Sequence, residues 1–264
     1  MHKVTHSPTI DHMALDLSIV IPCYNEEQNI RLGTLDKVAH YMEQRKYSWE
    51  VLIVDDGSSD ESLSLIREFC DDNRGFRVLA NAHQGKAGTV VAGMLAATGE
   101  NILFTDLDQA TPINQVELLL PFINKEFDIV IGSRKGRRLG APFLRRLMGP
   151  GFMIVRNLIL GLKGIEDTQC GFKIFKKEVA RNIFNRLKLY KRHQTTSGPR
   201  VTAGFDVEIL YVAAKLGYKI KEVPVEWHYV DTRRVSPLTD SLDALVDILK
   251  IKYYSFRGLY GGSI

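Results

Sequence analysis

The chain has 264 residues, of which 45% are hydrophobic and 25% are charged. This composition excludes global disorder and is typical of one globular domain with a sizeable core. The formal net charge is +4, which permits anionic partners without identifying them. Three widely spaced cysteines argue against a disulfide framework or a zinc site and favour a reducing cytoplasm. No apolar run approaches the roughly 18 residues of a transmembrane helix, so we expect any membrane contact to be peripheral.

The amino-terminal part of the chain predicts a leader, a strand and a helix. Residues 1–16 lack the apolar run of a secretory signal, and we interpret them as a flexible leader. The β-rich run LSIVI begins at Leu17 and leads into PCYNEE, which predicts a strand, a turn and a helix start. Asn25 is expected to cap that helix. Apolar and small residues at 30, 34, 38 and 41 follow at helical spacing and predict one continuous helix.

Strand-like runs continue to alternate with helical segments through the first half of the chain. The further runs are Val51–Val54, Phe76–Ala80 and Asn101–Thr105. The alternation predicts an α/β fold with a mostly parallel sheet and helices on both faces. Ligands in such sheets bind beyond the carboxyl ends of the strands. Because these ends carry Asn25, Asp55 and Asp106 with further acids beside them, we expect an acidic site on one rim.

The second half of the chain changes in character. A helix over about 114–122 is followed by the strand DIVIGSR, which ends at Arg134. A basic stretch comes next, with no acid between Gly132 and Gly164. The apolar segment 152–162 is predicted to be helical. A last helix is expected to begin at Pro237, with Ser236 as its N-cap, and to be amphipathic through Leu238, Leu242, Leu245 and Leu249. Both apolar segments are candidates for a membrane interface or for ordinary core.

We therefore expect a single domain over residues 17–264 behind the leader. Its parts are a nucleotide-sugar half at 17–110, an acceptor half at 111–235, and a carboxyl-terminal amphipathic helix and tail at 236–264. We found no repeat, low-complexity tract or linker that divides the chain further.

The triplet Asp106-Leu107-Asp108 directly follows the strand NILFT. Two carboxylates on such a loop suit Mg²⁺ or Mn²⁺, which can bridge the phosphates of a nucleotide diphosphate. An exposed pair of loop acids is the alternative, and the position on an acidic rim favours the metal. Asp55 and Asp56 are either a turn with a helix cap or acceptors for a base. Lys86, in the small-residue turn GKAG, either approaches a phosphate or is solvated.

Six segments follow one another in the order known from one enzyme family. They are IVIPCYNEEQNI, VLIVDDGSSDES, LFTDLDQAT, DIVIGSR, DTQCGFKIF and GFDVEILYVAAKLGYKIKEVPVEW. Together they resemble the inverting, family-two glycosyltransferases with the GT-A fold. The resemblance is closest to the dolichyl-phosphate glucosyltransferases and more distant to the polyprenyl-phosphate mannose synthases, and it extends from Leu17 to about Tyr254.

The resemblance implies roles for individual residues. It implies that the nucleotide-sugar is bound by Pro22, Tyr24, Asn25, Glu26, Asp55, Asp56, Lys86 and Asp106. It also implies that Asp106 and Asp108 hold the metal. Ala110 after Asp108-Gln109 matches the D-A-D-G-A of the glucosyl branch better than the D-A-D-L-Q of the mannose synthases. The expected donor is therefore UDP-glucose and the expected acceptor a polyprenyl (dolichyl-type) phosphate.

A lipid phosphate is already anionic near neutral pH and can attack the anomeric carbon in line without a strong base. Such a reaction needs positioned cations for two negatively charged reactants. Guanidinium groups fit phosphate bidentately, so the expected acceptor-phosphate residues are Arg134, Arg145, Arg146 and Arg234. We expect Asp108, Arg134, Arg145 and Asp167 to be catalytic. We expect no nucleic acid partner, and we place the protein peripherally on the cytoplasmic face of a membrane.

Four alternatives remain open from the sequence. A mannose synthase would use GDP-mannose, and a transferase to a glycan or protein hydroxyl would need a base such as Asp167. Changes from the glucosyl branch at Val91 and Ala203 suggest a nucleotide-sugar binding protein without turnover. A dinucleotide-dependent dehydrogenase is disfavoured because no G-x-G-x-x-G follows the first strand.

Overall fold

The structure is a computed structural model that describes residues 15–123, 125–134, 143–162, 164–189, 203–228 and 237–261. Within these ranges the side chains of 143–150, 203 and 237–241 are outside the description. Most of the expected leader and the predicted N-cap Ser236 also lie outside the described residues. Leu15 and Asp16 already bond to the sheet region, since the carbonyl of Leu15 accepts from Glu100 and the amide of Asp16 donates to Ser48.

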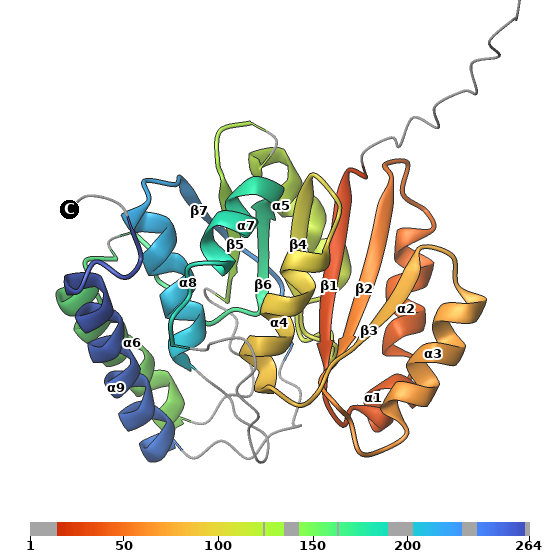
Figure 1. The fold of residues 1–264 in the computed structure, drawn as a ribbon, viewed down its shortest axis with the longest axis horizontal. Coiled ribbons are helices and arrows are strands. Elements are labelled where there is room, and N and C mark those ends of the chain that lie inside the picture. The colour runs from red at the N-terminus through yellow and green to blue at the C-terminus, as the bar shows by residue number, and fades with distance from the viewer. Residues whose placement is uncertain are drawn as a thin grey trace, which may run out of the picture.

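A seven-stranded sheet forms the centre of the molecule (Figure 1). Its strands are β1 (Leu17–Cys23), β2 (Trp49–Asp55), β3 (Phe76–Ala80), β4 (Asn101–Thr105), β5 (Ile129–Ser133), β6 (Phe172–Lys176) and β7 (Ile220–Pro224). Their order is β3-β2-β1-β4-β6-β5-β7. β6 runs antiparallel to β4 and β5, and the other pairs are parallel. The prediction of a mostly parallel sheet is confirmed.

Helices cover both faces of this sheet, as predicted. They are α1 (Glu27–Arg31), α2 (Thr34–Met42), α3 (Ser62–Asp72), α4 (Gly85–Ala96), the 3-10 turn η1 (Ile113–Gln115), α5 (Val116–Ile123), α6 (Phe143–Leu160), α7 (Lys177–Phe184), α8 (Ala203–Lys215) and α9 (Pro237–Phe256). Alternate strand residues face opposite ways. On β1, Val20 joins the core with α4, α7 and α8, whereas Ile19 and Ile21 join the core with α2, α3 and α5.

The continuous helix expected after Asn25 is divided into two. α1 ends at Arg31 and α2 begins at Thr34, and Gly33 between them has φ 76°. Such a left-handed conformation suits glycine and ends a helix. The expected cap is also wrong, because α1 has Glu26 at its N-cap and no side-chain cap bond. Asn25 binds a neighbouring loop instead.

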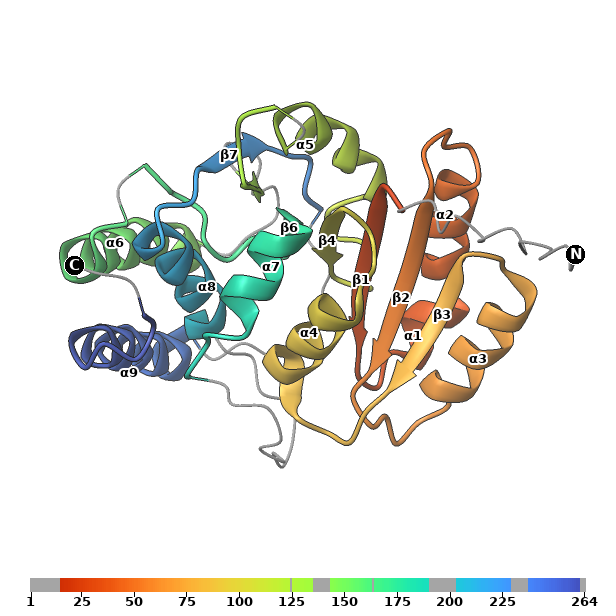
Figure 2. The same ribbon diagram turned by 45° about the horizontal axis from the view of Figure 1, so that its top comes forward.

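α6 and α9 lie side by side at the end of the molecule away from β3 (Figures 1 and 2). Ala244, Ile248 and Ile251 on α9 are buried, while Leu242 and Leu249 are exposed. The expected amphipathic helix is therefore not confirmed, because Leu242, Leu245 and Leu249 of the predicted stripe are exposed and point away from the core. Within the described residues, no helix combines the length and the apolar character needed to cross a bilayer.

The sheet brings four loops to one rim. β1, β2, β4 and β5 are parallel, so their carboxyl ends lie at the same edge. The antiparallel β6 begins at this edge, because Phe172 pairs with Thr105 at the end of β4. The candidate residues after β1, β2, β4 and β5, and those just before β6, are therefore gathered in one place.

Candidate active site

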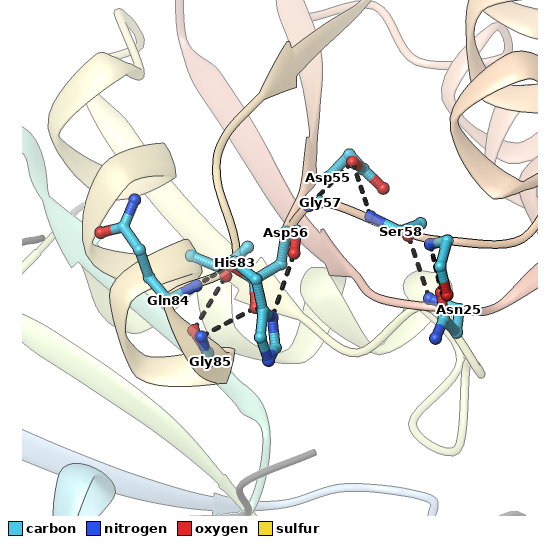
Figure 3. Close-up of polar contacts among 10 residues, drawn as sticks. Asn25, Asp55, Asp56, Gly57, Ser58, His83, Gln84 and Gly85 are labelled. Atoms are coloured by element: carbon cyan, nitrogen blue, oxygen red, sulfur yellow. Dashed lines mark hydrogen bonds and ion pairs between the residues drawn. The ribbon is translucent and has the colours of Figure 1, made fainter. Parts of the chain in front are cut away.

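Asp56 joins the loop after β2 to the start of α4. Its carboxylate is buried and accepts from the amides of Gln84 at 2.7 Å and Gly85 at 2.8 Å. The first amides of a helix have no partner within the helix, and α4 has no cap bond from its own N-cap residue. Asp56 supplies this cap from another loop (Figure 3). Asp56, which was predicted to bind the nucleotide-sugar, thus fixes the helix start that carries Lys86.

His83 lies against both Tyr24 and Asp56. Its ring stacks on that of Tyr24 with centroids 4.2 Å apart and planes inclined by 16°. Its Nδ1 is 2.8 Å from Asp56 Oδ2. The sequence offered no signal for this histidine beyond its place two residues before the GKAG turn. We call this stacked pair at the rim the aromatic platform, because a planar base can stack on an aromatic ring.

Asn25 and Asp55 hold the loops after β1 and β2 together. The amide of Asn25 donates to Ser58 Oγ at 3.0 Å, and Asn25 Oδ1 accepts from the amide of Ser59 at 2.8 Å. Asn25 has φ 52°, a conformation that asparagine tolerates better than most residues. Asp55 Oδ2 accepts from Gly57 and Ser58, which closes a tight turn (Figure 3).

Pro22 and Glu26 complete this side of the site. Pro22 is half-buried on β1 opposite Val54. The amide of Glu26 donates to Ser62 Oγ at 2.8 Å, and its carboxylate accepts from Asn29. Six of the eight residues expected to bind the nucleotide-sugar therefore lie at the carboxyl ends of β1 and β2 or in the loops that follow, and these two loops bond to each other.

Asp106 and Asp108 follow β4, as predicted. Lys86 on α4 forms an ion pair with Asp106, and Asp108 Oδ1 accepts from the amide of Ala110 at 3.0 Å. Gly171 lies so close to Asp106 that any side chain at this position would overlap the carboxylate. Because Gly171 has no side chain, its backbone can lie beside the Asp106 carboxylate, which stays partly exposed at the rim.

The donor set fits a divalent cation that takes most of its ligands from elsewhere. The described residues contain no group of three or more His, Cys, Asp or Glu placed to hold a metal. Mg²⁺ is commonly bound through one or two carboxylates and completed by water and phosphate oxygens. Asp106 and Asp108 could supply such a pair, and the adjacent Lys86 could supply a cation for a bound phosphate.

Arg134 and Asp167 form a bidentate ion pair at the end of β5. Arg134 Nε and Nη2 each lie 2.7 Å from a carboxylate oxygen of Asp167, and the amide of Arg134 donates to the same group. Burial alone would raise the pKa of Asp167, but the hydrogen bonds and charge of Arg134 outweigh it and hold this pKa at about 2. Burial also opposes the charge on Arg134, yet the bonds to Asp167 raise its pKa overall.

Lys173 is a buried cation that the sequence did not single out. Its Nζ donates to Asp206 Oδ1 at 2.6 Å and to the carbonyl of Cys170, and it lies 5.0 Å from the centre of the Phe104 ring. It sits one residue after the start of β6, close to Gly171. A buried charge needs such partners, so Lys173 fixes Asp206 of α8 beside the rim.

Trp227 is a second residue that sequence reasoning missed. The Arg134 guanidinium carbon is 5.7 Å from the centre of its ring. Trp227 belongs to the quoted segment EVPVEW, but nothing in that segment distinguished a rim residue from core. The side chains of Arg145 and Arg146, and all of Arg234, lie outside the described residues, so their expected role stays a prediction.

A mostly parallel sheet with an acidic rim beside a helix start is the arrangement of an α/β protein whose ligand site lies at the carboxyl ends of its strands. The sequence profile of Glycosyl transferase family 2 matches residues 18–184. A dolichyl-phosphate beta-glucosyltransferase of Dictyostelium discoideum is 35% identical over 92% of this chain and 76% of its own length. The human protein of that name is 31% identical over 95% of this chain and 79% of its own length. The chain belongs to glycosyl transferase family 2, and it is a glycosyltransferase, as the sequence resemblance indicated.

Solved structures share the fold. Glucosyl-3-phosphoglycerate synthase from Mycobacterium tuberculosis in complex with UDP superposes with a TM-score of 0.61 at 19% identity, covering 94% of this chain and 87% of that one. The same synthase with Mn²⁺, UDP and glucosyl-3-phosphoglycerate gives 0.59 at 17% identity, covering 95% and 87%. These likenesses confirm the predicted GT-A fold.

Proposed function

We propose that this glycosyltransferase transfers glucose from UDP-glucose to a polyprenyl (dolichyl-type) phosphate with inversion, releasing UDP. Relatives named dolichyl-phosphate beta-glucosyltransferase cover 92% of this chain in Dictyostelium and 95% in humans. The shared length includes both the donor loops and the segments around Arg134 and Asp167. Similarity over both halves supports a common donor and a common acceptor.

The donor side of the proposal rests on two linked loops and a short helix start. The Tyr24–His83 platform offers a stacking surface for uracil. Asn25 and Asp55 fix the turns around it. Asp56 orients the first turn of α4 and therefore Lys86, whose ammonium would neutralise a diphosphate.

Asp106 and Asp108 would hold Mg²⁺ or Mn²⁺ at the diphosphate. When bound, the cation would supply positive charge to the leaving UDP. Lys86 now pairs with Asp106, and on donor binding its ammonium would serve the same phosphate oxygens. The two carboxylates, together with water and phosphate ligands, match the needs of such an ion.

The state of Asp167 is the observation that carries the choice of acceptor. A hydroxyl acceptor needs a general base whose pKa lies near the working pH. Asp167 has a pKa of about 2 and is held by Arg134 in a bidentate pair. It is therefore a weak base and a strong anchor for a guanidinium. A phosphate acceptor needs no base, and Arg134, with Arg145, Arg146 and Arg234, would provide its cations.

A polyprenyl phosphate acceptor is held in a bilayer by its isoprenoid tail, so the protein would act at a membrane surface. We place it peripherally on the cytoplasmic face, where UDP-glucose and the lipid phosphate would meet. No nucleic acid is involved in this account.

A donor-by-acceptor matrix with purified protein tests the proposal. UDP-glucose, UDP-galactose, UDP-N-acetylglucosamine and GDP-mannose are each supplied with dolichyl phosphate in detergent and with soluble sugar or peptide acceptors. We expect metal-dependent glycolipid formation with UDP-glucose and dolichyl phosphate. Product from GDP-mannose alone would identify a mannose synthase, and product on a hydroxyl alone would overturn the acceptor. Binding of UDP-glucose without any turnover would indicate a binding protein.

A further inference from the structure

α9 is apolar on two opposite faces. From Ala244 onward each turn of the helix buries a residue, namely Ala244, Ile248, Ile251 and Ser255. A second stripe repeats at three and four residues on the outer face and consists of Leu242, Leu245, Val246, Leu249, Tyr253 and Phe256. All six of these are exposed, and Phe256 is 82% exposed. An outer stripe of this kind is unlike the polar outer face of an ordinary surface helix.

α6 shows the same arrangement beside it. Its outer side chains include Ile154, Val155 and Leu158, the last of which is 80% exposed. Arg156 points inward and is buried, donating to Thr168 Oγ1 at 3.1 Å and to the carbonyl of Ile165. The arginine that interrupts the apolar segment in the sequence therefore does not interrupt its exposed face. We call the exposed residues of α6 and α9 together the outer apolar surface.

The carboxyl-terminal part of this surface is surrounded by cations, whereas the exposed acid Asp243 lies beside Leu242 at its other end. From Ile248 to Gly261 the chain has no acid and contains Lys250, Lys252 and Arg257, which are all exposed. α6 lies in a stretch without acids between Gly132 and Gly164. Apolar side chains flanked by lysine and arginine are complementary to an anionic lipid surface. They are less suited to a second copy of the same positively charged face, because like charges would then meet.

Both helices leave from the rim that carries the site. Phe143, where α6 begins, follows Arg134 by nine positions, and α9 begins 13 positions after Pro224 at the end of β7. The carboxyl ends of β5 and β7 lie at the same edge. Arg156 also bonds α6 to Thr168, the neighbour of Asp167. The helices of the outer apolar surface are thus linked to Arg134, the residue proposed to bind the acceptor phosphate.

We propose that the outer apolar surface lies in the headgroup region of an anionic lipid bilayer, with the Arg134 rim facing the lipid phosphates. The choice of a lipid partner rests on the proposed function, whereas the surface itself is defined by exposure and charge. α6 and α9 would lie along the interface, and their buried faces would stay on the core. A membrane-bound acceptor would then reach the site without leaving the bilayer.

Vesicle flotation tests this surface. Purified protein is mixed with phosphatidylcholine vesicles with and without phosphatidylglycerol, and the bound fraction is measured for wild type, Leu245→Glu/Leu249→Glu and Ile154→Glu/Leu158→Glu. Leu118→Glu on α5 is the matched control, since Leu118 is also an exposed helical leucine, but its helix packs on the core at the other face of the sheet. We expect each of these apolar side chains to contribute about tenfold to partitioning when it enters the lipid, so both double variants should lose binding and the control should keep it. Replacing Lys250, Lys252 and Arg257 with Gln should remove the preference for phosphatidylglycerol.

Three results would overturn the proposal. They are wild-type protein that does not float, double variants that float equally well, and a wild-type dimer that the variants dissociate without any change in flotation. The variants alter exposed positions, so their melting temperatures should match wild type. Turnover with a short, water-soluble prenyl phosphate separates the two claims. No turnover together with normal flotation would reject the proposed function but not the lipid-binding surface. Turnover without flotation would reject the lipid-binding surface but not the proposed function.

Discussion

Two nitrogens of the Arg134 guanidinium each donate to a carboxylate oxygen of Asp167 at 2.7 Å, although the two residues are 33 positions apart in the chain. This ion pair therefore joins the two ends of the segment that connects β5 to β6 and includes α6. Asp167 is further held by Glu222, which accepts from its amide at 3.0 Å. Four arginines were expected to bind the acceptor phosphate, and the structure describes the side chain of Arg134 alone among them. The ion pair fixes this guanidinium.

Removing this carboxylate should destabilise the fold. Asp167→Asn leaves a buried guanidinium without its counter-charge, and we expect a loss of about 3 kcal/mol in the free energy of unfolding at pH 7. Asp71→Asn, at an exposed acid on α3, is the control and should change little. Urea denaturation measures both, and equal stability of Asp167→Asn and wild type would show that the pair contributes nothing.

The same pair predicts a pH dependence. The folded pKa of Asp167 is about 2, below its ordinary value of 3.8, so its contribution to stability is complete above pH 4 and lost as the pH falls toward 2. The shift corresponds to about 2 kcal/mol. The difference in unfolding free energy between wild type and Asp167→Asn should therefore shrink between pH 4 and pH 2. A difference that stays constant over this range would contradict the depressed pKa.

Gly171 provides a test of the metal site that leaves its ligands intact. Gly171→Ala places a methyl group against the Asp106 carboxylate, and we expect Mn²⁺ affinity in the presence of UDP to fall about tenfold. Gly151→Ala on α6 is the control, because a side chain there meets open space. Calorimetric titration with Mn²⁺ gives the comparison. Unchanged affinity in Gly171→Ala would place the metal away from Asp106.

His83 should matter for nucleotide binding although it was absent from the sequence-based site. His83→Ala removes the ring against Tyr24 and the contact with Asp56, and UDP affinity should fall about tenfold. His83→Phe retains the stacking and should lose less. His40→Ala, at an exposed histidine of α2, should bind UDP like wild type. If His83→Ala does so too, the platform has no part in donor binding.

The buried Lys173–Asp206 pair can be measured by a double-mutant cycle. Lys173→Met leaves Asp206 without its cation and should cost about 3 kcal/mol in the free energy of unfolding. The double change Lys173→Met/Asp206→Leu should cost less than the sum of the single changes, with a coupling of about 1–3 kcal/mol. Additive single effects would mean that the 2.6 Å contact carries no energy.

The strands and the acidic rim were predictable because they depend on local patterns. Apolar runs such as Leu17–Ile21 mark buried strands, and parallel strands bring their carboxyl ends to one edge. The antiparallel direction of β6 follows from pairing between distant segments, which no local pattern contains. The outward stripe of α9 was visible as spacing, but a second buried stripe from Ala244 to Ser255 made its direction impossible to assign from periodicity alone.

The candidate site was predicted in part for a similar reason. Asp106 and Asp108 follow directly from the strand before them, whereas the roles of Asp167 and His83 depend on partners far along the chain. Asp167 was expected as a possible base, and only its contact with Arg134 shows how strongly its proton is lost. His83 and Gly171 act through proximity to Asp56 and Asp106, which spacing in the sequence does not reveal.

Product analysis tests the central claim most directly. UDP-α-glucose is incubated with a short prenyl phosphate and Mn²⁺, and the purified product is examined by ¹H and ³¹P NMR. The account predicts a β-glucosyl phosphodiester, with the sugar carbon bonded through phosphate to the lipid. A glucosyl group on a hydroxyl, an α-linked phosphodiester, or no product despite bound UDP-glucose would contradict it.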